Sequence, residues 1–453
     1  MIATIPSAVL HGVEGRRVSV EVHVSTGLPG FTVVGLPDAA VRESRDRVRA
    51  ALLSSGLPWP TRRTTVNLAP SGERKAGAGL DLPIAVGVLV ATGVLPTGAV
   101  DGAAFCGELG LDGSVRGVPG ALALREAVRP LAIVLSPTAA SEAALAEGGE
   151  VRAAETLAAL VEHLRRRRPW PTVRPPVAAT PSGDVPSVAG GTVPDLADVR
   201  GQRGARRALE IAAAGGHHLL LVGPPGSGKS MLAVRLPGLL PDLDRHRALE
   251  VARVRSAAGL SLDDGRLLYR PPFRAPHHGT SAVSMIGGGS GRLRPGEVSL
   301  ANGGVLFLDE LGEFSAAVLD ALRQPLEEGT VRVSRARGAV EYPARFLLVA
   351  AMNPCPCGAG GGPGACRCST AARARYARRV SGPLLDRFDL AVRVDRPDVD
   401  EFLSGVVPED TRAVAARVAA VRQRAAGRGV GANAELDEPA LDQFAAMEAS
   451  ARA

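Results

Sequence analysis

The sequence predicts an α/β protein with two domains, the second of which is built on a parallel sheet. Apolar runs of strand length alternate with helical runs along most of the 453 residues. A phosphate-binding loop directly follows one of these strands, at residues 223–230. A stretch rich in proline, glycine, serine and threonine separates two α/β regions and is typical of a flexible linker.

Each region has its own pattern of elements. The first domain is expected at residues 1–164, with strands at 18–24, 31–34 and 64–68 and helices at 39–54 and 82–92. The linker is predicted at 165–194 and the nucleotide-binding domain at 195–396, with buried strands at 219–222, 305–308 and 346–350. After Pro397 the pattern turns helical, so residues 397–453 are interpreted as the start of a small helical lid.

The phosphate-binding loop fits the pattern G-x-x-x-x-G-K-[ST]. It consists of Gly223, Pro224, Pro225, Gly226, Ser227, Gly228, Lys229 and Ser230. Its glycines let backbone N–H groups close around phosphate oxygens, and the following helix adds partial positive charge. Lys229 would neutralise the β and γ phosphates of ATP, and Ser230 would hold Mg²⁺. The chain has only two lysines against 51 arginines, which indicates that this lysine has a role arginine cannot fill.

Two further strands end in polar residues that suit ATP hydrolysis. The strand at 305–308 ends in Asp309 and Glu310, which would hold Mg²⁺ and activate the attacking water, respectively. A helix N-cap is the alternative interpretation of this pair. The third strand leads to Asn353, which would contact the γ-phosphate and the water, or simply serve as a turn residue before Pro354.

Three sets of residues outside these strands are further candidates. Arg387 lies between two acids in the sequence. It would act as an arginine finger on a neighbouring subunit's ATP, or it would form a local salt bridge. Four cysteines within a glycine-rich loop could close a tetrahedral Zn²⁺ site, with a free-thiol loop as the alternative: Cys355, Cys357, Cys366 and Cys368. A predicted hairpin over 328–342 carries three arginines near its tip: Arg332, Arg335 and Arg337. The hairpin would contact DNA, with a solvated hairpin as the alternative.

Several of these motifs resemble one bacterial family. This chain is similar in five motifs to the ComM/YifB family of magnesium-chelatase-like AAA+ ATPases. The motifs are the phosphate loop, Pro276-His277-His278, Leu308-Asp309-Glu310-Leu311, Asn353-Pro354-Cys355-Pro356-Cys357-Gly358 and the run 381–389. The N-terminal half matches as well, at Val34-Gly35-Leu36-Pro37-Asp38 and Val66-Asn67-Leu68-Ala69-Pro70. The resemblance covers nearly the whole chain.

The resemblance implies a fold and an activity. It implies an N-terminal domain similar to the Lon protease domain (ribosomal S5 domain 2-like), then an AAA+ core with an incomplete helical lid, because family members continue past Ala453 with a lid arginine. The Lon-type Ser–Lys dyad has no serine at residues 75–81, so proteolysis is not expected. Hexameric rings and DNA branch migration during natural transformation are further implications.

Composition limits the partners and the location. The formal charge of +7 is weak support for a polyanionic partner, and aromatic residues make up 3 % of the chain, so base stacking is not expected. No signal peptide is seen, and the longest apolar run, at 82–95, is shorter than the about 20 residues that span a bilayer. A cytoplasmic protein without a membrane partner is therefore expected.

Three functions fit these observations. The first is an ATP-driven ring that moves on branched or single-stranded DNA without sequence specificity. The second is a chelatase-type motor that remodels a protein partner, and the third is a regulatory ATP-binding protein. The arginine-bearing hairpin favours the first over the second, and Glu310 argues against the third because binding alone does not need it.

Overall fold

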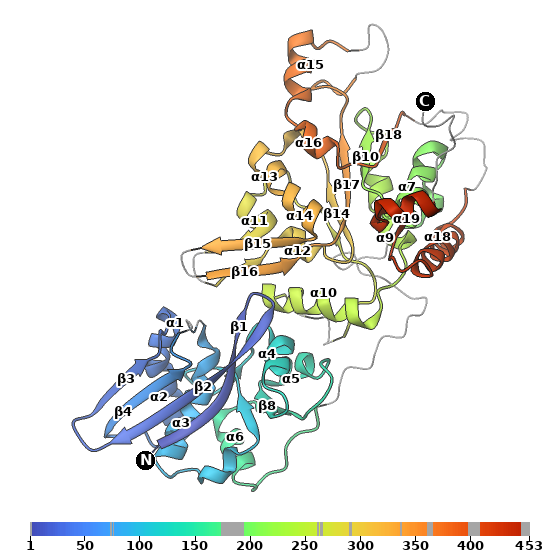
Figure 1. Cartoon of the computed structure of the whole chain (residues 1–453). Helices are drawn as coiled ribbons and strands as arrows, with labels where there is room; N and C mark the ends of the chain where they lie inside the picture. Colours follow the sequence, from blue (N-terminus) through green and yellow to red (C-terminus); the bar gives the residue numbers. More distant parts are fainter. Residues whose placement is uncertain are drawn as a thin grey trace.

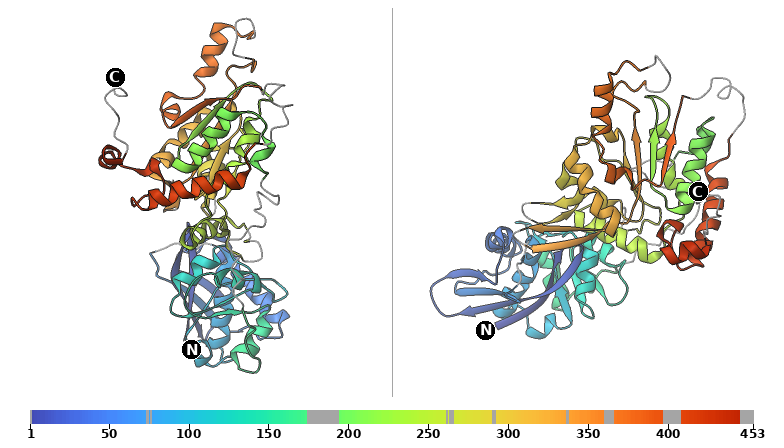
Figure 2. Two further views of the ribbon diagram at one scale, coloured as in Figure 1. Left: turned by 90° about the vertical axis from the view of Figure 1, so that its right-hand side faces the viewer. Right: turned by 45° about the horizontal axis from the view of Figure 1, so that its top comes forward.

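The computed structural model describes residues 2–72, 75, 77–173, 194–260, 262, 266–289, 292–335, 338–359, 366–396 and 408–444. An N-terminal α/β domain lies at one end of the molecule, and a larger α/β domain lies at the other, with helix α10 between them (Figure 1). Helix α15 projects from the far end of the larger domain, in all three views (Figures 1 and 2).

The N-terminal domain contains two main sheets. The four-stranded sheet has the order β1-β2-β4-β3, and a parallel three-stranded sheet has the order β5-β8-β9. The strands are β1 Ile2–His11, β2 Glu14–Ser25, β3 Gly30–Val34, β4 Arg63–Ala69, β5 Ala103–Phe105, β6 Glu108–Leu109, β7 Val115–Arg116, β8 Ala132–Leu135 and β9 Val151–Ala153. The helices are α1 Ala39–Arg42, α2 Ser44–Ser54, α3 Asp81–Ala91, α4 Ala121–Ala127, α5 Pro137–Ala143 and α6 Leu157–Leu164.

The core of this domain forms around α3, every residue of which is buried. Its apolar sequence suits a helix that contacts β1 and β2 on one side and α2 on another. Packed residues continue beyond α6: Trp170 stacks on His163 with ring centroids 4.7 Å apart, and Val173 contacts a second apolar cluster. Most of the predicted linker, residues 174–193, lies outside the described part of the chain.

The larger domain is built on a five-stranded parallel sheet with the order β11-β14-β17-β10-β18. Its strands and hairpins are β10 Leu219–Val222, β11 Phe273–Arg274, β12 Gly287–Gly288, β13 Arg294–Pro295, β14 Val305–Leu308, β15 Thr330–Arg335, β16 Gly338–Pro343, β17 Leu347–Met352 and β18 Leu390–Arg393. Its helices are α7 Arg203–Gly215, α8 Lys229–Ala233, α9 Leu236–Leu239, α10 Arg245–Ala258, α11 Ala282–Ile286, α12 Glu297–Leu300, α13 Ala316–Ala321, α14 Arg323–Glu328, α15 Thr370–Ala377, α16 Gly382–Leu385, α18 Thr411–Ala426 and α19 Glu438–Phe444.

The central strands are apolar at every position because both faces of the sheet are covered. Alternate residues of β10, β14 and β17 pack with α7, α9 and α18 on one face. The intervening residues pack with α11, α13 and the β15–β16 hairpin on the other. The predicted parallel sheet and the predicted hairpin are therefore both present.

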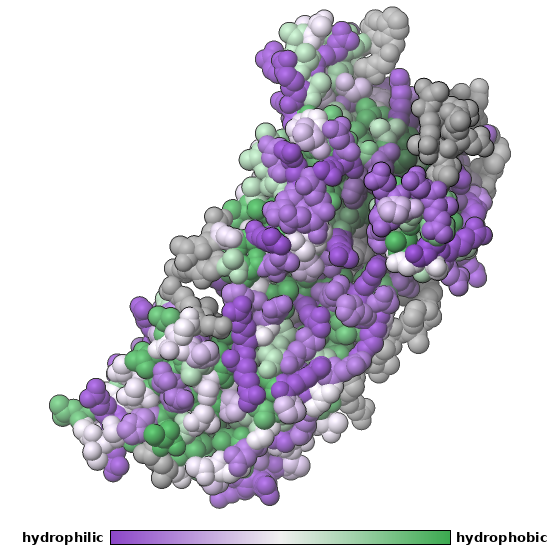
Figure 3. Space-filling model, viewed as in Figure 1, coloured by the Kyte–Doolittle hydropathy of each residue, from purple (hydrophilic) through white to green (hydrophobic). Residues whose placement is uncertain are grey.

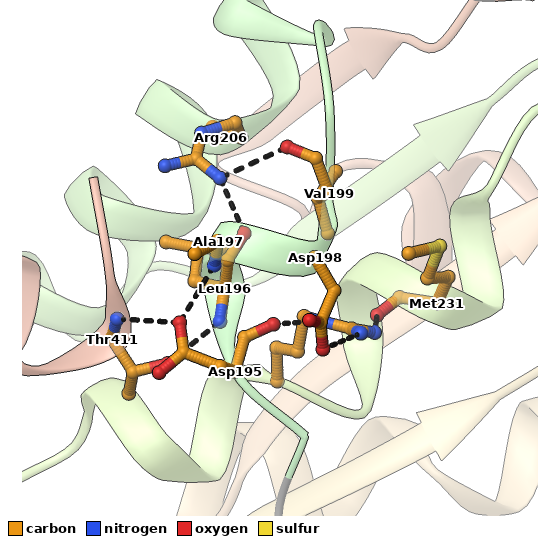
Figure 4. Close-up of polar contacts among 9 residues, drawn as sticks. Asp195, Leu196, Ala197, Asp198, Val199, Arg206, Met231 and Thr411 are labelled. Atoms are coloured by element: carbon orange, nitrogen blue, oxygen red, sulfur yellow. Dashed lines mark hydrogen bonds and ion pairs between the residues drawn. The ribbon is translucent and has the colours of Figure 1, made fainter. Parts of the chain in front are cut away.

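The start of the larger domain is bonded to its last long helix (Figure 4). The Leu196 N–H donates to Thr411 Oγ1 at 2.7 Å, and the Thr411 N–H donates to Asp195 Oδ1 at 3.1 Å. Arg206 donates to the carbonyl oxygens of Leu196 and Val199. Helix α18 is thus attached to the core as it begins. Residues 397–407 and 445–453 of the predicted lid lie outside the described residues.

Helix α10 connects the two domains through polar contacts. The hydroxyl of Ser256 donates to the Glu142 carboxylate and accepts the Gly120 N–H at 2.8 Å. Arg253 forms an ion pair with Glu126 at 2.6 Å. Apolar residues of α10 also form one cluster with residues of the N-terminal domain. No helix in the described part of the chain is long and apolar enough to cross a membrane.

Candidate active site

The carboxyl ends of three neighbouring strands meet at one edge of the sheet. Val222 pairs with Met352 and Leu308 pairs with Ala350, so the residues that follow these strands lie side by side. They enclose a pocket of about 420 Å³, lined by Pro225, Gly226, Gly228, Lys229, Ser230, Met231, Asp309, Glu310, Ala351, Met352 and Asn353. The structure therefore brings together the phosphate loop, the acidic residues that follow β14 and the asparagine that follows β17, as the sequence predicted.

Lys229 is folded onto its own loop. Its Nζ donates to the carbonyl oxygens of Gly223 and Pro224, both at 2.8 Å, and to Asn353 Oδ1 at 3.3 Å. Burial lowers the pKa of Lys229, while the nearby Asp309 and Glu310 oppose this shift. Lys229 thus lines the pocket, and the present partners of its ammonium group are neutral oxygens that a phosphate could replace.

The predicted magnesium ligands are in contact with each other. The Ser230 hydroxyl donates to Asp309 Oδ2 at 2.6 Å. These are hard oxygen donors of the kind that Mg²⁺ prefers, and they adjoin the phosphate loop, so the residues fit this ion. Asp309 also accepts the backbone N–H of Glu310 at 2.9 Å, which fixes the turn after the strand.

Glu310 adopts a left-handed backbone conformation with φ of 53°. This conformation is uncommon for a residue with a Cβ atom, and such outliers cluster at functional sites. Its carboxylate is exposed and lies 3.3 Å from Nδ1 of His278. The His278 ring in turn lies edge-on to Phe314, with centroids 6.5 Å apart.

His278 and Gln202 are site residues that sequence reasoning did not assign. The structure places the ring of His278 against the predicted catalytic glutamate. Gln202 has a left-handed φ of 53° and donates from Nε2 to the Ser227 carbonyl oxygen at 3.2 Å, which connects α7 to the phosphate loop. His278 lies in the run Pro276-His277-His278 that carries the family resemblance, and that was the available signal for it.

The four cysteines form a compact cluster beside the ATP pocket. All four Sγ atoms lie within 4.8 Å of one another, and three of the separations are 3.3, 3.5 and 3.7 Å. A tetrahedron with metal–sulfur bonds of about 2.3 Å has sulfur–sulfur edges of about 3.8 Å. The donor set therefore fits a Zn²⁺ ion. Backbone hydrogen bonds from Ala359 and Arg367 also help lower the pKa of the Cys357 thiol to about 6.

The cysteine loop presses against the phosphate-binding loop. A Cβ atom at Gly358, whose φ is 73°, would lie 2.5 Å from Cδ of Pro225. Tyr376, which follows the cysteines, is hydrogen bonded to the backbone of Asn353. Two ends of the ATP pocket thus depend on the shape of this loop.

Arg387 does not line the ATP pocket of its own chain. It forms an ion pair with Glu327, and both side chains are partly exposed. Nearby, Asp389 accepts the backbone N–H of His218 at 2.7 Å, and this bond anchors the arginine segment to the start of β10. The partner in this salt bridge is Glu327, 60 positions away, rather than one of the two adjacent acids, and a role on a neighbouring subunit stays a prediction.

The hairpin is present, but the first of its three arginines is paired. Arg332 forms an ion pair with Glu341 at 2.8 Å on the opposite strand. Arg335 ends β15, but its side chain lies outside the described atoms, as does the whole of Arg337. The hairpin also contacts the N-terminal domain, where His11 Nε2 lies 3.2 Å from the Ala339 carbonyl oxygen.

Comparisons with known proteins agree with this architecture. Residues 195–402 match the family described as magnesium chelatase, subunit ChlI, and residues 20–133 match a second description, subunit ChlI of Mg-chelatase. YifB of Escherichia coli K12 is 44 % identical over 444 residues, which cover 96 % of this chain and 85 % of that protein. Competence protein ComM of Haemophilus influenzae is 44 % identical over 397 residues, or 87 % and 76 % of the two chains.

A protein of Mycobacterium tuberculosis H37Rv is 46 % identical over 443 residues, which cover 96 % of this chain and 86 % of that one. The resemblance inferred from the motifs is thus confirmed by identity along most of the chain. The α/β fold class, with an AAA+ core after an N-terminal α/β domain, is confirmed with it. The chain belongs to the ComM/YifB family of magnesium-chelatase-like AAA+ proteins.

Proposed function

We propose that this protein is an ATP-hydrolysing motor that assembles into a ring, most simply a hexamer, and acts on DNA in the cytoplasm. The observation that carries the ATPase proposal is the contact between Ser230 and Asp309 at 2.6 Å, directly beside Lys229 and Glu310. A nucleotide-binding loop, a magnesium ligand and a carboxylate for water activation meet in one pocket. That combination supports hydrolysis more than binding alone.

The chain's own residues have separate roles in this proposal. The loop 223–230 binds the phosphates through backbone N–H groups, and Lys229 leaves its carbonyl partners to neutralise them. Ser230 and Asp309 would hold Mg²⁺, which supplies charge neutralisation when bound. Glu310 orients the attacking water and accepts its proton, and Asn353, already 3.3 Å from Lys229 Nζ, fixes the end of the γ-phosphate.

The four-cysteine cluster is proposed as a structural Zn²⁺ site. Its donors are soft thiols at suitable separations, with Cys355 buried and the others more open to solvent. The site would keep the loop that contacts Pro225 in one shape. Its contribution is to the geometry of the ATP pocket and involves no step of the reaction.

DNA is the proposed partner because of the family relationship and the positively charged hairpin. The relative with the name competence protein ComM supports a role in the handling of DNA during transformation or recombination. A specific observation favours a second candidate, a motor that remodels a protein partner: the ion pair with Glu341 neutralises Arg332. The hairpin therefore offers less free positive charge than its sequence suggests.

The ATPase proposal is tested by Lys229→Ala and Glu310→Gln. Lys229→Ala is expected to weaken ATP binding by roughly 10- to 100-fold, since a hydrogen bond to a charged group contributes about 1.5–3 kcal/mol. Glu310→Gln should keep the affinity and lower turnover by about 10²- to 10⁴-fold, because only the proton acceptor is lost. Binding is measured with a fluorescent ATP analogue and turnover by phosphate release.

Glu155→Gln, an exposed glutamate in the N-terminal domain, is the matched control and should leave both quantities unchanged. Equal nucleotide affinity in Lys229→Ala and the parent would reject the phosphate-loop assignment. Parent-like turnover in Glu310→Gln would instead reject the role of this carboxylate alone. Stimulation of the parent's ATPase by forked or single-stranded DNA separates the DNA motor from the protein-remodelling motor.

A further inference from the structure

Helix α15 stands away from the rest of the molecule (Figures 1 and 2). Of its eight residues, Tyr376 is the one that is buried, and the other seven are exposed or half-exposed. A helix this short is not stable in water without packing. It is anchored by Tyr376, by the Ser369 hydroxyl that accepts the Ala372 N–H at 3.1 Å, and by the cysteine cluster that precedes it.

This projection carries charge of one sign. The described residues 366–381, which include α15, contain five arginines and no aspartate or glutamate: Arg367, Arg373, Arg375, Arg378 and Arg379. In the space-filling view, purple hydrophilic residues lie beside pale green and white ones at this end of the molecule (Figure 3). Soluble surfaces usually mix both signs, so an exposed segment without acids indicates an anionic partner.

The arginines are mostly free to meet such a partner. Arg379 is paired with Glu313 at 2.8 Å and lies over the ring of Tyr376. The other four are exposed, and within the described residues none of them has an ion pair. This contrasts with Arg332 of the hairpin, whose charge is opposed by Glu341.

We propose that α15 together with Arg367 is a second nucleic-acid contact, one that binds the phosphate backbone. The projection has one aromatic residue, Tyr376, and it is buried, so contacts to phosphates are available and base stacking is not. The inference rests on the proposed action on DNA and adds a second position for it. It lies beside the cysteine cluster, apart from the hairpin (Figure 1).

The test measures how DNA affinity depends on salt. The variant Arg373→Gln/Arg375→Gln/Arg378→Gln is compared with the parent by fluorescence anisotropy on labelled single-stranded and duplex DNA, at several KCl concentrations. Because each phosphate contact contributes about 0.7 to 0.9 units to the slope of log K against log salt, the slope should become shallower by roughly two to three units. Affinity at low salt should fall at least about tenfold.

Two further variants make the result specific. Arg373→Lys/Arg375→Lys/Arg378→Lys keeps the charge and should keep the parent slope, since phosphate is also bound by a point charge. Arg49→Gln/Arg412→Gln/Arg424→Gln removes three exposed arginines elsewhere and should change nothing. Loss of binding in the lysine variant as well would show that the charge is not the cause, and would overturn the proposal.

Other outcomes separate this inference from the proposed function. If Arg332→Gln flattens the slope and the α15 variant does not, the hairpin binds DNA and the inference about α15 fails. If the α15 variant lowers the mass of the assembly but keeps the slope, α15 is a contact to another copy of the chain, which also overturns it. If the parent shows no salt-dependent DNA binding, both the inference and the DNA motor fail.

Discussion

At the scale of single residues, His218 shows how one proton state is imposed by the fold. Its Nδ1 accepts the backbone N–H of Leu348 at 3.0 Å, so this nitrogen must be unprotonated. Burial lowers the pKa of His218, opposed mainly by the nearby Asp389. The residue joins β10, β17 and the segment that carries Arg387, so its charge state bears on the whole strand edge.

We expect acidification to destabilise the protein through this histidine. The pKa of His218 in the folded protein is below its ordinary value of 6.5, so the unfolded chain binds more protons as the solution is acidified. The contribution of His218 to stability is therefore complete above pH 6.5 and is lost as the pH falls below 6.5. Urea unfolding at about pH 7.5 and about pH 5.5 should show a smaller pH effect in His218→Gln, which accepts without titrating.

His246→Gln, whose parent side chain is 79 % exposed, is the control and should keep the parent's pH dependence. The same pH profile in His218→Gln as in the parent would contradict the assignment. The loss per hydrogen bond is expected to be about 1 kcal/mol.

Some single-residue contacts follow from sequence and others do not. The ion pair between Arg332 and Glu341 follows from the hairpin register once Arg335 is paired with Gly338, because the numbers of opposite residues have a constant sum. The contact of His278 with Glu310 could not be predicted in this way. It depends on the path of an irregular segment after β11, for which the sequence has no periodicity to read.

At the scale of elements, the cysteine loop is the one that links two sites. Its turn at Gly358 leaves no room for a side chain against Pro225, and Cys355 follows two residues after Asn353. Rigidity of this loop should therefore affect both a metal site and the nucleotide pocket.

Protein purified without chelators is expected to contain about one zinc per chain, as four thiolates complete one tetrahedral site. Cys357→Ser/Cys366→Ser should release the metal, lower the melting temperature and weaken ATP binding, because the loop no longer supports Pro225. Metal analysis and thermal unfolding measure this. Cys106→Ala, a cysteine outside the cluster, should retain the zinc, and fresh protein without metal would exclude the site.

The apolar central strands were the elements best predicted from sequence. β10, β14 and β17 have uninterrupted apolar runs because both sheet faces are covered, and parallel pairing then requires their polar ends to meet. β11 has two residues and could not be recognised, since its place in the sheet comes from its neighbour β14. The exposed position of α15 could not be predicted either, because the periodicity of a helix does not show whether other elements pack against it.

At the scale of the whole molecule, Arg387 lies outside the lining of its own ATP pocket. Its ion pair with Glu327 places it at the surface, where a neighbouring subunit of a ring could meet it. We expect Arg387→Ala to keep nucleotide binding and to lower hydrolysis by about 10³-fold or more, the range for such arginines. Arg424→Ala, an exposed arginine of α18, is the control.

Mixing the two inactive proteins tests whether the arginine acts between subunits. Arg387→Ala and Glu310→Gln should restore some activity when combined, because one mixed interface contains both intact groups. Absence of recovery at any ratio, with normal assembly mass, would count against this role.

The contact between the hairpin and the N-terminal domain joins segments more than 300 residues apart, and it has no sequence signature.

The bond between Thr411 and Asp195 spans 216 positions of the chain, which matters for synthesis on the ribosome. The N-terminal domain can fold soon after Val173 is made, because domains generally fold as units and from the N-terminus. The AAA+ core must wait for α18, whose Val414 and Val418 belong to its apolar cluster. Until then, α7 and α9 keep an uncovered apolar face, so the nascent chain passes through a long interval in which chaperone binding is favoured.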